Sequence, residues 1–84
     1  MIWVTQVEYL GDYRLKLAFS DGLIGMVDLE PTIRNDARRL FRELADLEGF
    51  RRHRLDMDTV VWVNGLDLAP EYLHSLAEQM PIAA

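Results

Sequence analysis

The dipeptide Asp21-Gly22 restricts the fold more than any other feature, because it separates two segments with apolar residues at alternate positions. Asp and Gly together can supply the backbone angles of a two-residue type I′ turn, which joins antiparallel strands. In residues 13–20, apolar side chains at Leu15, Leu17 and Phe19 follow the two-residue period of a half-buried strand. The pattern therefore predicts an antiparallel hairpin around this turn.

A further strand over residues 3–10 precedes this hairpin, and a turn is expected at residues 10–12. A three-residue loop there would place Val7 opposite Leu15, whereas a two-residue loop would place Val7 opposite Lys16. We expect the three-residue loop, because it keeps apolar residues on one face. Pairing of Ser20 with Leu23 then completes a three-stranded meander that ends near Leu29. Its predicted apolar face comprises Leu15, Leu17, Phe19, Ile24 and Met26, with Ala18 and Gly25 on the opposite face.

From Pro31 onward the period of the apolar residues changes to that of a helix. Apolar residues recur at spacings of three and four up to Phe50, with arginines on the other side, which is typical of an amphipathic segment lying on a sheet. Asp36 and Asp46 are suitable helix N-caps. We expect an irregular start, a main helix over Ala37–Leu44 and a second short turn from Asp46.

Residues 59–73 contain a strand, a turn and a helix start in succession. Val60 to Val63 form a β-branched and aromatic run, Asn64-Gly65 favours a turn, and Pro70 suits the first turn of a helix. The segment predicts a second hairpin, His53–Val63, and a C-terminal helix, Pro70–Met80. The complete prediction is a two-layer α+β domain, with both hairpin units packed by the main helix and the C-terminal helix.

The bulk composition limits the classes of protein to consider. A chain of 84 residues is long enough for one domain with one small core. It contains no cysteine, which excludes disulfides and cysteine zinc sites and is typical of a reducing compartment. Its apolar runs fall short of the roughly 20 residues that span a bilayer, and the N-terminus lacks a secretory pattern. We expect a single cytoplasmic domain over residues 1–84.

Charge is distributed unevenly along the chain, whose net charge is -5. Between Arg34 and Arg54 there are seven basic and four acidic residues, a local net charge of +3, whereas the remainder holds two basic and ten acidic residues, a net of -8. Such polarity can steer a charged partner or support self-association. The alternative is a solvated arginine-rich face on an acidic domain. The negative total disfavours non-specific nucleic-acid binding.

The titratable and nucleophilic residues match no catalytic or metal-binding pattern. His53 and His74 are too far apart in sequence for a local metal motif. Ser20 is expected in a turn and Ser75 on a helix, and neither lies in a nucleophile elbow. The carboxylate pairs, Asp56 with Asp58 and Asp67 with Glu71, lie at turns and helix starts, where solvated carboxylates collect. We expect no catalytic residue, metal or cofactor.

The strongest candidates for recognition are Trp62, Asn64 and Asp67. An aromatic residue beside a turn, followed by an acidic one, can form a shallow binding surface with an aromatic anchor. The structural alternative places Trp62 in the core, Asn64 in the turn and Asp67 in bonds to backbone N–H groups before the helix. With exposed residues of the arginine segment and the C-terminal helix, the candidate partner-binding residues are Arg38, Arg42, Trp62, Asn64, Asp67 and Tyr72.

Four motifs point to a known family. They are L-x-L-x-F-S-D-G over residues 15–22, V-D-L over residues 27–29, F-x-x-L over residues 41–44 with Phe50 after it, and W-x-N-G-x-D-L-x-P-E-x-L over residues 62–73. Through them nearly the whole chain resembles the small bacterial family called domain of unknown function 2442. Val63 departs from the pattern, since the family more often has proline there. The resemblance implies a two-layer α+β domain with the order β-β-β-α-β-β-α.

The resemblance implies no enzymatic activity. Members look like one half of small two-gene modules of the toxin–antitoxin kind, and some carry a DNA-binding helix-turn-helix after this domain. Our leading hypothesis is a non-enzymatic, antitoxin-like interaction module that binds a small protein partner. The competing hypothesis is a nucleic-acid-binding regulator that uses the segment Arg34 to Arg54.

Overall fold

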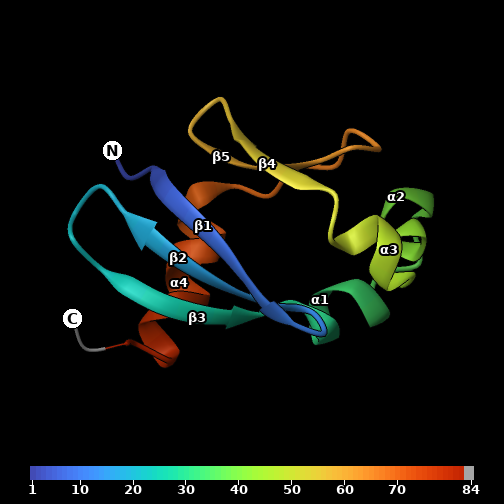
Figure 1. Cartoon of the computed structure of the whole chain (residues 1–84), viewed down its shortest axis with the longest axis horizontal. Helices are drawn as coiled ribbons and strands as arrows, with labels where there is room; N and C mark the ends of the chain where they lie inside the picture. Colours follow the sequence, from blue (N-terminus) through green and yellow to red (C-terminus); the bar gives the residue numbers. More distant parts are fainter. Residues whose placement is uncertain (83–84) are drawn as a thin grey trace.

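The computed structural model describes residues 1–82, which form a three-stranded sheet, a separate hairpin, three short helices and a longer C-terminal helix (Figure 1). This confirms the predicted α+β architecture. The strands are β1 (Val4–Gly11), β2 (Arg14–Phe19), β3 (Ile24–Asp28), β4 (His53–Asp56) and β5 (Thr59–Trp62). The helices are α1 (Glu30–Arg34), α2 (Arg39–Glu43), α3 (Leu47–Phe50) and α4 (Pro70–Gln79).

The first hairpin pairs β1 with β2 in a register two residues away from the predicted one. Val7 lies opposite Leu17, where Leu15 was expected. The reason is an irregularity between Tyr9 and Gly11, where the backbone takes a positive φ of 108° at Gly11. The strand continues to Gly11, which pairs with Arg14, so the turn has two residues and the expected three-residue loop is wrong. Because a shift of two residues preserves the alternation, Val7 remains on the predicted face of the sheet.

The turn between β2 and β3 is not of type I′. The Phe19 carbonyl accepts a hydrogen bond from the Gly22 N–H at 3.0 Å, and the Phe19 N–H donates to the Leu23 carbonyl at 2.9 Å, so the loop has three residues. Only Gly22 in this loop has a positive φ, 92°, while the Asp21 carboxylate accepts from the Leu23 N–H at 3.0 Å. This is the geometry of a type I turn followed by a left-handed glycine.

The extra loop residue changes which side chains of β3 are buried. Leu17 pairs with Gly25, and Lys16 pairs with Met26. Ile24 and Met26 therefore lie on the more open face of the sheet, and the prediction that they share a face with the buried leucines is wrong. Gly25 and Val27 occupy the buried face instead.

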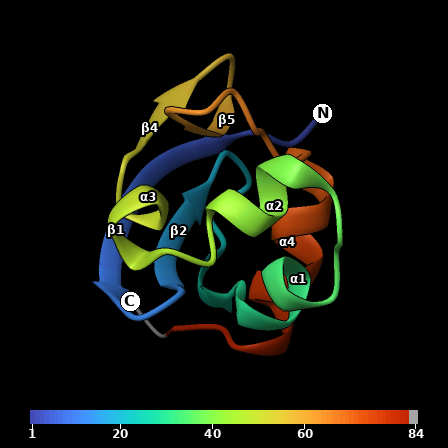
Figure 2. The same cartoon turned by 90° about the vertical axis from the view of Figure 1, so that its right-hand side faces the viewer.

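Helix α4 covers that buried face and approaches it closely at one point (Figures 1 and 2). A Cβ added at Gly25 would lie 2.6 Å from the Ala77 carbonyl oxygen and 2.8 Å from the Ala77 Cβ. Only glycine permits this distance between strand and helix. After the helix, the Met80 carbonyl accepts from the Met26 N–H at 3.0 Å, and the Ile82 N–H donates to the Ile24 carbonyl at 2.8 Å, so the chain after α4 covers the β3 edge.

The predicted main helix, Ala37–Leu44, is not a single packed helix. Helix α2 has five residues, and α4 is the helix that packs on the sheet. Asp36 does not cap it: the Asp36 carboxylate accepts from the Arg38 N–H at 3.0 Å, and the N-cap is Arg38 itself, without a side-chain hydrogen bond. Asp46 does cap α3, accepting from the Glu48 N–H at 3.3 Å.

The core lies between the covered sheet face, α4 and the segment of short helices. Phe50 stands at their junction, with its ring 5.3 Å from that of Tyr13 and 5.7 Å from that of Trp62. The hairpin β4–β5 joins the sheet through the Val4 N–H, which donates to the Asp58 carbonyl at 3.0 Å. The buried apolar side chains are Val4, Tyr13, Leu15, Leu17, Phe19, Val27, Leu29, Ile33, Phe41, Leu44, Phe50, Val60, Trp62, Leu66, Leu73 and Ala77.

Candidate partner-binding surface

Helices α1 and α2 lie together at one end of the molecule (Figure 1), and the turn after β5 and Tyr72 of α4 reach them through side-chain contacts; this region is called here the helical corner (Figure 2). Two polar contacts connect its parts. The hydroxyl groups of Thr32 in α1 and Tyr72 in α4 lie 2.6 Å apart. The Asn64 side-chain amide donates to the Leu40 carbonyl of α2 at 3.1 Å. Segments more than 20 residues apart in sequence therefore form one surface.

Trp62 is located in the core and not on this surface. Only 1% of its surface is exposed, and its indole N–H donates to the Phe50 carbonyl at 2.8 Å. Its side chain therefore offers no anchor to a partner in this conformation. It connects β5 with the end of α3 instead, as the structural alternative expected.

Asn64 joins the turn to α2 through both ends of its side-chain amide. The nitrogen donates to the Leu40 carbonyl and, at 3.0 Å, to the Glu43 carboxylate, while the oxygen accepts from the Leu66 N–H at 3.1 Å. The bond from Asn64, with the nearby charge of Arg39, lowers the pKa of Glu43 below its ordinary value. Asn64 thus fixes the position of α2.

Asp67 and Tyr72 remain on the surface. The Asp67 carboxylate makes no hydrogen bond or ion pair within residues 1–82, and α4 begins at an N-cap, Ala69, without a side-chain bond. The expected bonds from Asp67 to backbone N–H groups are therefore absent from this part of the chain. Tyr72 is 39% exposed, and its hydroxyl contacts Thr32.

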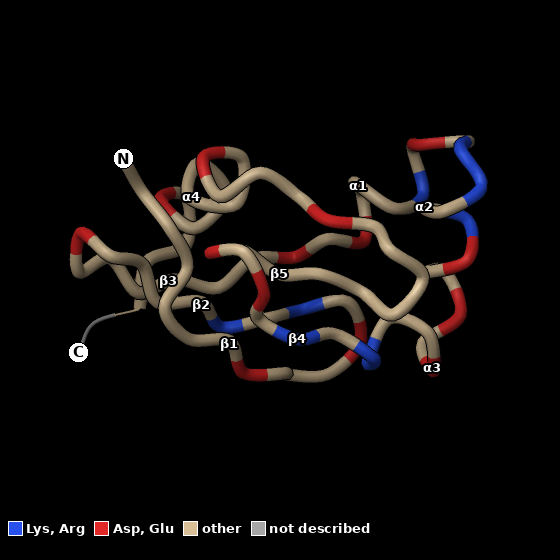
Figure 3. The backbone as a smooth tube through the Cα atoms, turned by 90° about the horizontal axis from the view of Figure 1, so that it is seen from above, with Lys and Arg blue, Asp and Glu red and all other residues tan. Residues whose placement is uncertain are grey.

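Most arginines of the helical corner are paired with carboxylates nearby in sequence. Figure 3 shows basic and acidic residues interspersed along this part of the backbone. Arg38 binds Asp36 through two nitrogens, the closer at 2.7 Å, and also lies 4.9 Å from the Phe41 ring centre. These hydrogen bonds lower the pKa of Asp36 to about 2. Further ion pairs join Arg34 to Glu30 at 2.8 Å and Arg39 to Glu43 at 3.0 Å.

Arg42 differs from these neighbours. It is exposed, and within residues 1–82 its guanidinium forms no ion pair. It lines a recess of about 370 Å³ between α1 and α2, together with Ile33, Arg34, Asp36, Ala37 and Ala45. The recess exists because the chain bends between Asn35 and Arg38, and the predicted start of the main helix at Ala37 did not indicate it.

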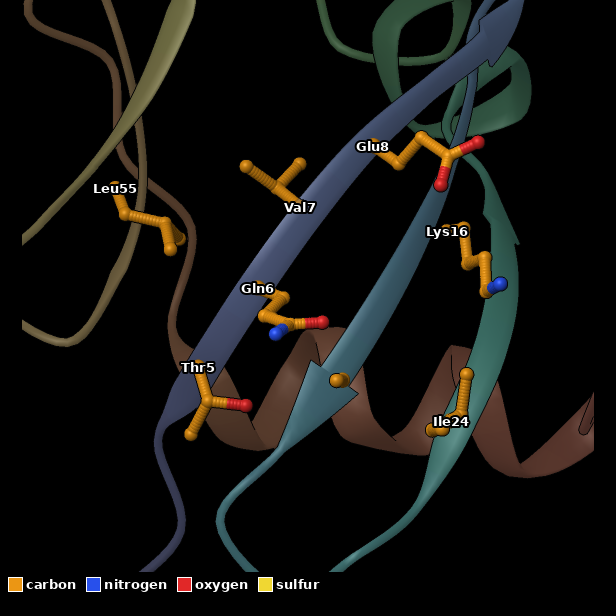
Figure 4. Close-up of a pocket in the computed structure, with 8 residues that line it drawn as sticks. Thr5, Gln6, Val7, Glu8, Lys16, Ile24 and Leu55 are labelled. Carbon is orange, nitrogen blue, oxygen red and sulfur yellow. The ribbon is translucent and has the colours of Figure 1, made fainter. Parts of the chain in front are cut away.

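A second hollow of about 370 Å³ lies on the more open face of the sheet (Figure 4). Leu55 of β4 forms one side, and Lys16 and Ile24 belong to the two strands beyond β1. Sequence reasoning missed it, because the predicted register placed Ile24 on the buried face. Its lining residues are Thr5, Gln6, Val7, Glu8, Lys16, Ala18, Ile24 and Leu55.

One histidine, in the middle of α4, lies between two carboxylates. The Nε2 atom of His74 is 2.8 Å from an Asp21 oxygen, and its Nδ1 atom is 3.3 Å from a Glu78 oxygen. Burial of the ring opposes protonation, but the bond to Asp21 and the two negative charges outweigh it and raise the pKa of His74. Within residues 1–82, no group of three or more acidic or histidine side chains is arranged to hold a metal ion.

The fold and the corner together define a small α+β domain. Its most distinctive sequence motif, W-x-N-G-x-D-L-x-P-E-x-L, has mainly a structural role. Trp62 connects β5 with α3, Asn64 connects the turn after β5 with α2, and Pro70 begins α4. The chain belongs to the DUF2442 family, described as a protein of unknown function, whose model matches residues 4–79. No curated protein and no solved structure matches the chain significantly. No helix within residues 1–82 is long and apolar enough to cross a membrane.

Proposed function

We propose that this chain is a non-enzymatic interaction module, the antitoxin-like half of a two-gene pair, which binds a small protein partner at its helical corner. The observation that carries this proposal is the separation of charge. The segment from Arg34 to Arg54 has a net charge of +3 in a chain whose remainder has -8. Although Glu30 and Asp67 of that remainder lie at the corner, an acidic patch on a compact partner can meet the exposed arginines there.

The pairing of the arginines favours a protein over a nucleic acid as the partner. Arg34, Arg38 and Arg39 each lie beside a carboxylate of the same part of the chain. A polyanion laid across them would meet those carboxylates within the Debye length, about 8 Å at physiological ionic strength. Nucleic-acid affinity depends on unopposed positive charge at many phosphates, which this surface offers at few points.

The size of the domain also supports a binding role. A single core in 84 residues leaves a small margin of stability, and a bound partner adds to it by mass action. We therefore expect the melting temperature of the chain to rise when its partner is present. This behaviour is typical of small proteins that act as one half of a pair.

The proposal is tested by capture of the tagged chain from a lysate of its own cells, followed by mass identification and reconstitution of the purified pair. The double variant Arg38→Glu, Arg42→Glu should lose the partner, and the matched double variant Arg51→Glu, Arg54→Glu, which makes the same change of charge in this segment outside the corner, should weaken binding much less. Labelled DNA and RNA are titrated against the chain at low and moderate salt. Micromolar nucleic-acid binding that persists at moderate salt and disappears in the first variant would replace this proposal with the regulator hypothesis.

A further inference from the structure

We propose that the recess between α1 and α2 receives an acidic side chain of the protein partner together with an adjacent apolar one, and that Arg42 binds the carboxylate. This inference rests on the proposed function and adds the chemistry of the contact. Arg42 is exposed and unpaired within residues 1–82, in contrast to Arg34, Arg38 and Arg39. The Arg42 guanidinium can therefore bind an acidic group without first breaking a local ion pair.

The walls of the recess fit an apolar side chain beside that carboxylate. Ile33 is only 4% exposed, and Ala37 and Ala45 are exposed but small. A volume of about 370 Å³ admits one or two side chains but no folded element. Ile33 is already buried, so the apolar surface that contact would remove from water, at about 25 cal/mol per Å², belongs mainly to Ala37 and Ala45.

The charges around the recess favour a carboxylate over a phosphate. Asp36 stands at its edge, and its hydrogen bonds with Arg38 lower its pKa to about 2, so it is negative at physiological pH. With Arg34, Arg42 and Asp36 in its lining, the recess has a net charge of +1, which a singly charged carboxylate neutralises, whereas a phosphate, with nearly twice that charge, leaves an excess of negative charge beside Asp36. A carboxylate can still accept two parallel hydrogen bonds from Arg42.

The recess has a fixed shape before any partner binds. Asn64 donates to the Leu40 carbonyl at the beginning of α2, and the Tyr13 hydroxyl donates to the Ala45 carbonyl after its end. Both bonds come from elements outside the short helices. A surface held in this way loses little conformational freedom on binding, which favours affinity from a small contact.

The test uses random twelve-residue peptides displayed on phage and selected on the purified chain. Enriched peptides should contain Asp or Glu next to an apolar residue. Measured by fluorescence anisotropy, Arg42→Gln should reduce the affinity for these peptides by about 10-fold or more, the factor that 1.4 kcal/mol represents. Ala37→Leu, which fills the recess, should reduce the affinity by a similar factor. Arg52→Gln, at an exposed arginine outside the recess, should leave their affinity unchanged.

Enrichment of peptides without acidic residues, no enrichment at all, or equal binding by wild type and both recess variants would overturn the inference. The same variants separate this inference from the proposed function. If a captured partner binds Arg42→Gln and Ala37→Leu as tightly as wild type, the recess is not its site, although the interaction module stands. If the purified pair fails to form with wild type, the proposed function itself fails. Near-ultraviolet circular dichroism of each variant confirms that its fold is intact.

Discussion

The sheet end and the helical corner of this domain are held together by different kinds of contact. At the sheet end, which comprises β1 to β3 and α4, the helix packs mainly on β3 and comes so close at Gly25 that no Cβ fits beneath Ala77. At the helical corner and in the adjoining α3, helices of four or five residues are connected to the rest by side chains that donate to backbone carbonyls. Trp62 and Asn64 provide two of these bonds.

The difference follows from what each segment can bury. A long helix and a sheet each present a continuous apolar face, so that dispersion and removal of water stabilise their contact. Helices of four or five residues leave many terminal carbonyls without intrahelical partners, and these need donors from elsewhere. The corner is therefore ordered by a few polar bonds, and changes at single residues should test the two regions differently.

The largest effect is expected for Gly25→Ala. The new Cβ would lie 2.6 Å from the Ala77 carbonyl oxygen, and backbone must move because no flexible side chain is there to yield. Overpacking of this kind costs about 1–3 kcal/mol. We expect the free energy of unfolding, measured in urea, to fall by an amount near the upper end of this range. Ala18→Val on the more open face is the control and should change stability by less than about 0.5 kcal/mol; equal losses in both variants would show that the close approach is not important.

Asn64→Ala should have the next largest effect. It removes the donor to the Leu40 carbonyl and the acceptor of the Leu66 N–H, both partly buried, at a cost of about 1–2 kcal/mol. Asn64→Asp keeps the acceptor but places a second carboxylate beside Glu43, so we expect a similar loss. Hydrogen exchange should show faster opening in α2 than in β2. Uniform acceleration through the whole domain would contradict the view that Asn64 mainly orders the corner.

The contrast also explains how much of the fold could be predicted. The alternation of Leu15, Leu17 and Phe19 depends only on neighbours along the strand, so it correctly indicated the buried face. The loop at Asp21-Gly22 was located correctly but assigned the wrong type, because the Asp21 side chain bonds to the Leu23 N–H and keeps a negative φ. One extra loop residue then reversed the faces of β3.

The polar bonds of the corner could not be predicted from the sequence. Asn64 binds the carbonyl of Leu40, 24 residues away, and every residue carries a carbonyl, so no side-chain pattern indicates the acceptor. The sequence indicated Asp36 as a suitable N-cap for a helix that begins at Ala37. In the structure, its bonds with Arg38 stabilise a bend instead, and the helix begins at Arg39. The recess beside Arg42 results from that bend and was therefore missed.

Gly22→Val tests the turn that sets the faces of β3. Gly22 has a φ of 92° with open space around it, so the cost is conformational and not steric. A β-branched residue there should destabilise the domain by about 1 kcal/mol or more, which corresponds to about 4–8 °C in melting temperature. Gly22→Asn should lose clearly less stability, because asparagine tolerates the left-handed backbone region. Equal melting temperatures for wild type and the Val variant would show that the positive φ is not required.

The smallest effect is expected at His74, which connects α4 with the β2–β3 turn through Asp21. The raised pKa of His74 means that the folded state binds the proton more tightly than the unfolded state. Its stabilisation is therefore complete below the ordinary pKa of about 6.5 and is lost as pH rises through the folded value. The Asp21 carboxylate accepts from the Leu23 N–H and from His74, which lowers its pKa, so its contribution is lost as pH falls below its ordinary value of 3.8.

The connection between α4 and the turn should accordingly be strongest between about pH 4 and pH 6.5. Wild type should have a higher melting temperature at pH 5.5 than at pH 8, and His74→Gln should reduce this difference. His53→Gln, which removes the other imidazole, is the control and should leave it unchanged. Because Asp21 and Glu78 are largely exposed, water and salt screen their attraction to the His74 ring. In the wild type, 1 M salt should therefore also reduce the difference in melting temperature between pH 5.5 and pH 8. If the pH dependence is lost in His53→Gln and kept in His74→Gln, the contact between His74 and Asp21 is not its source.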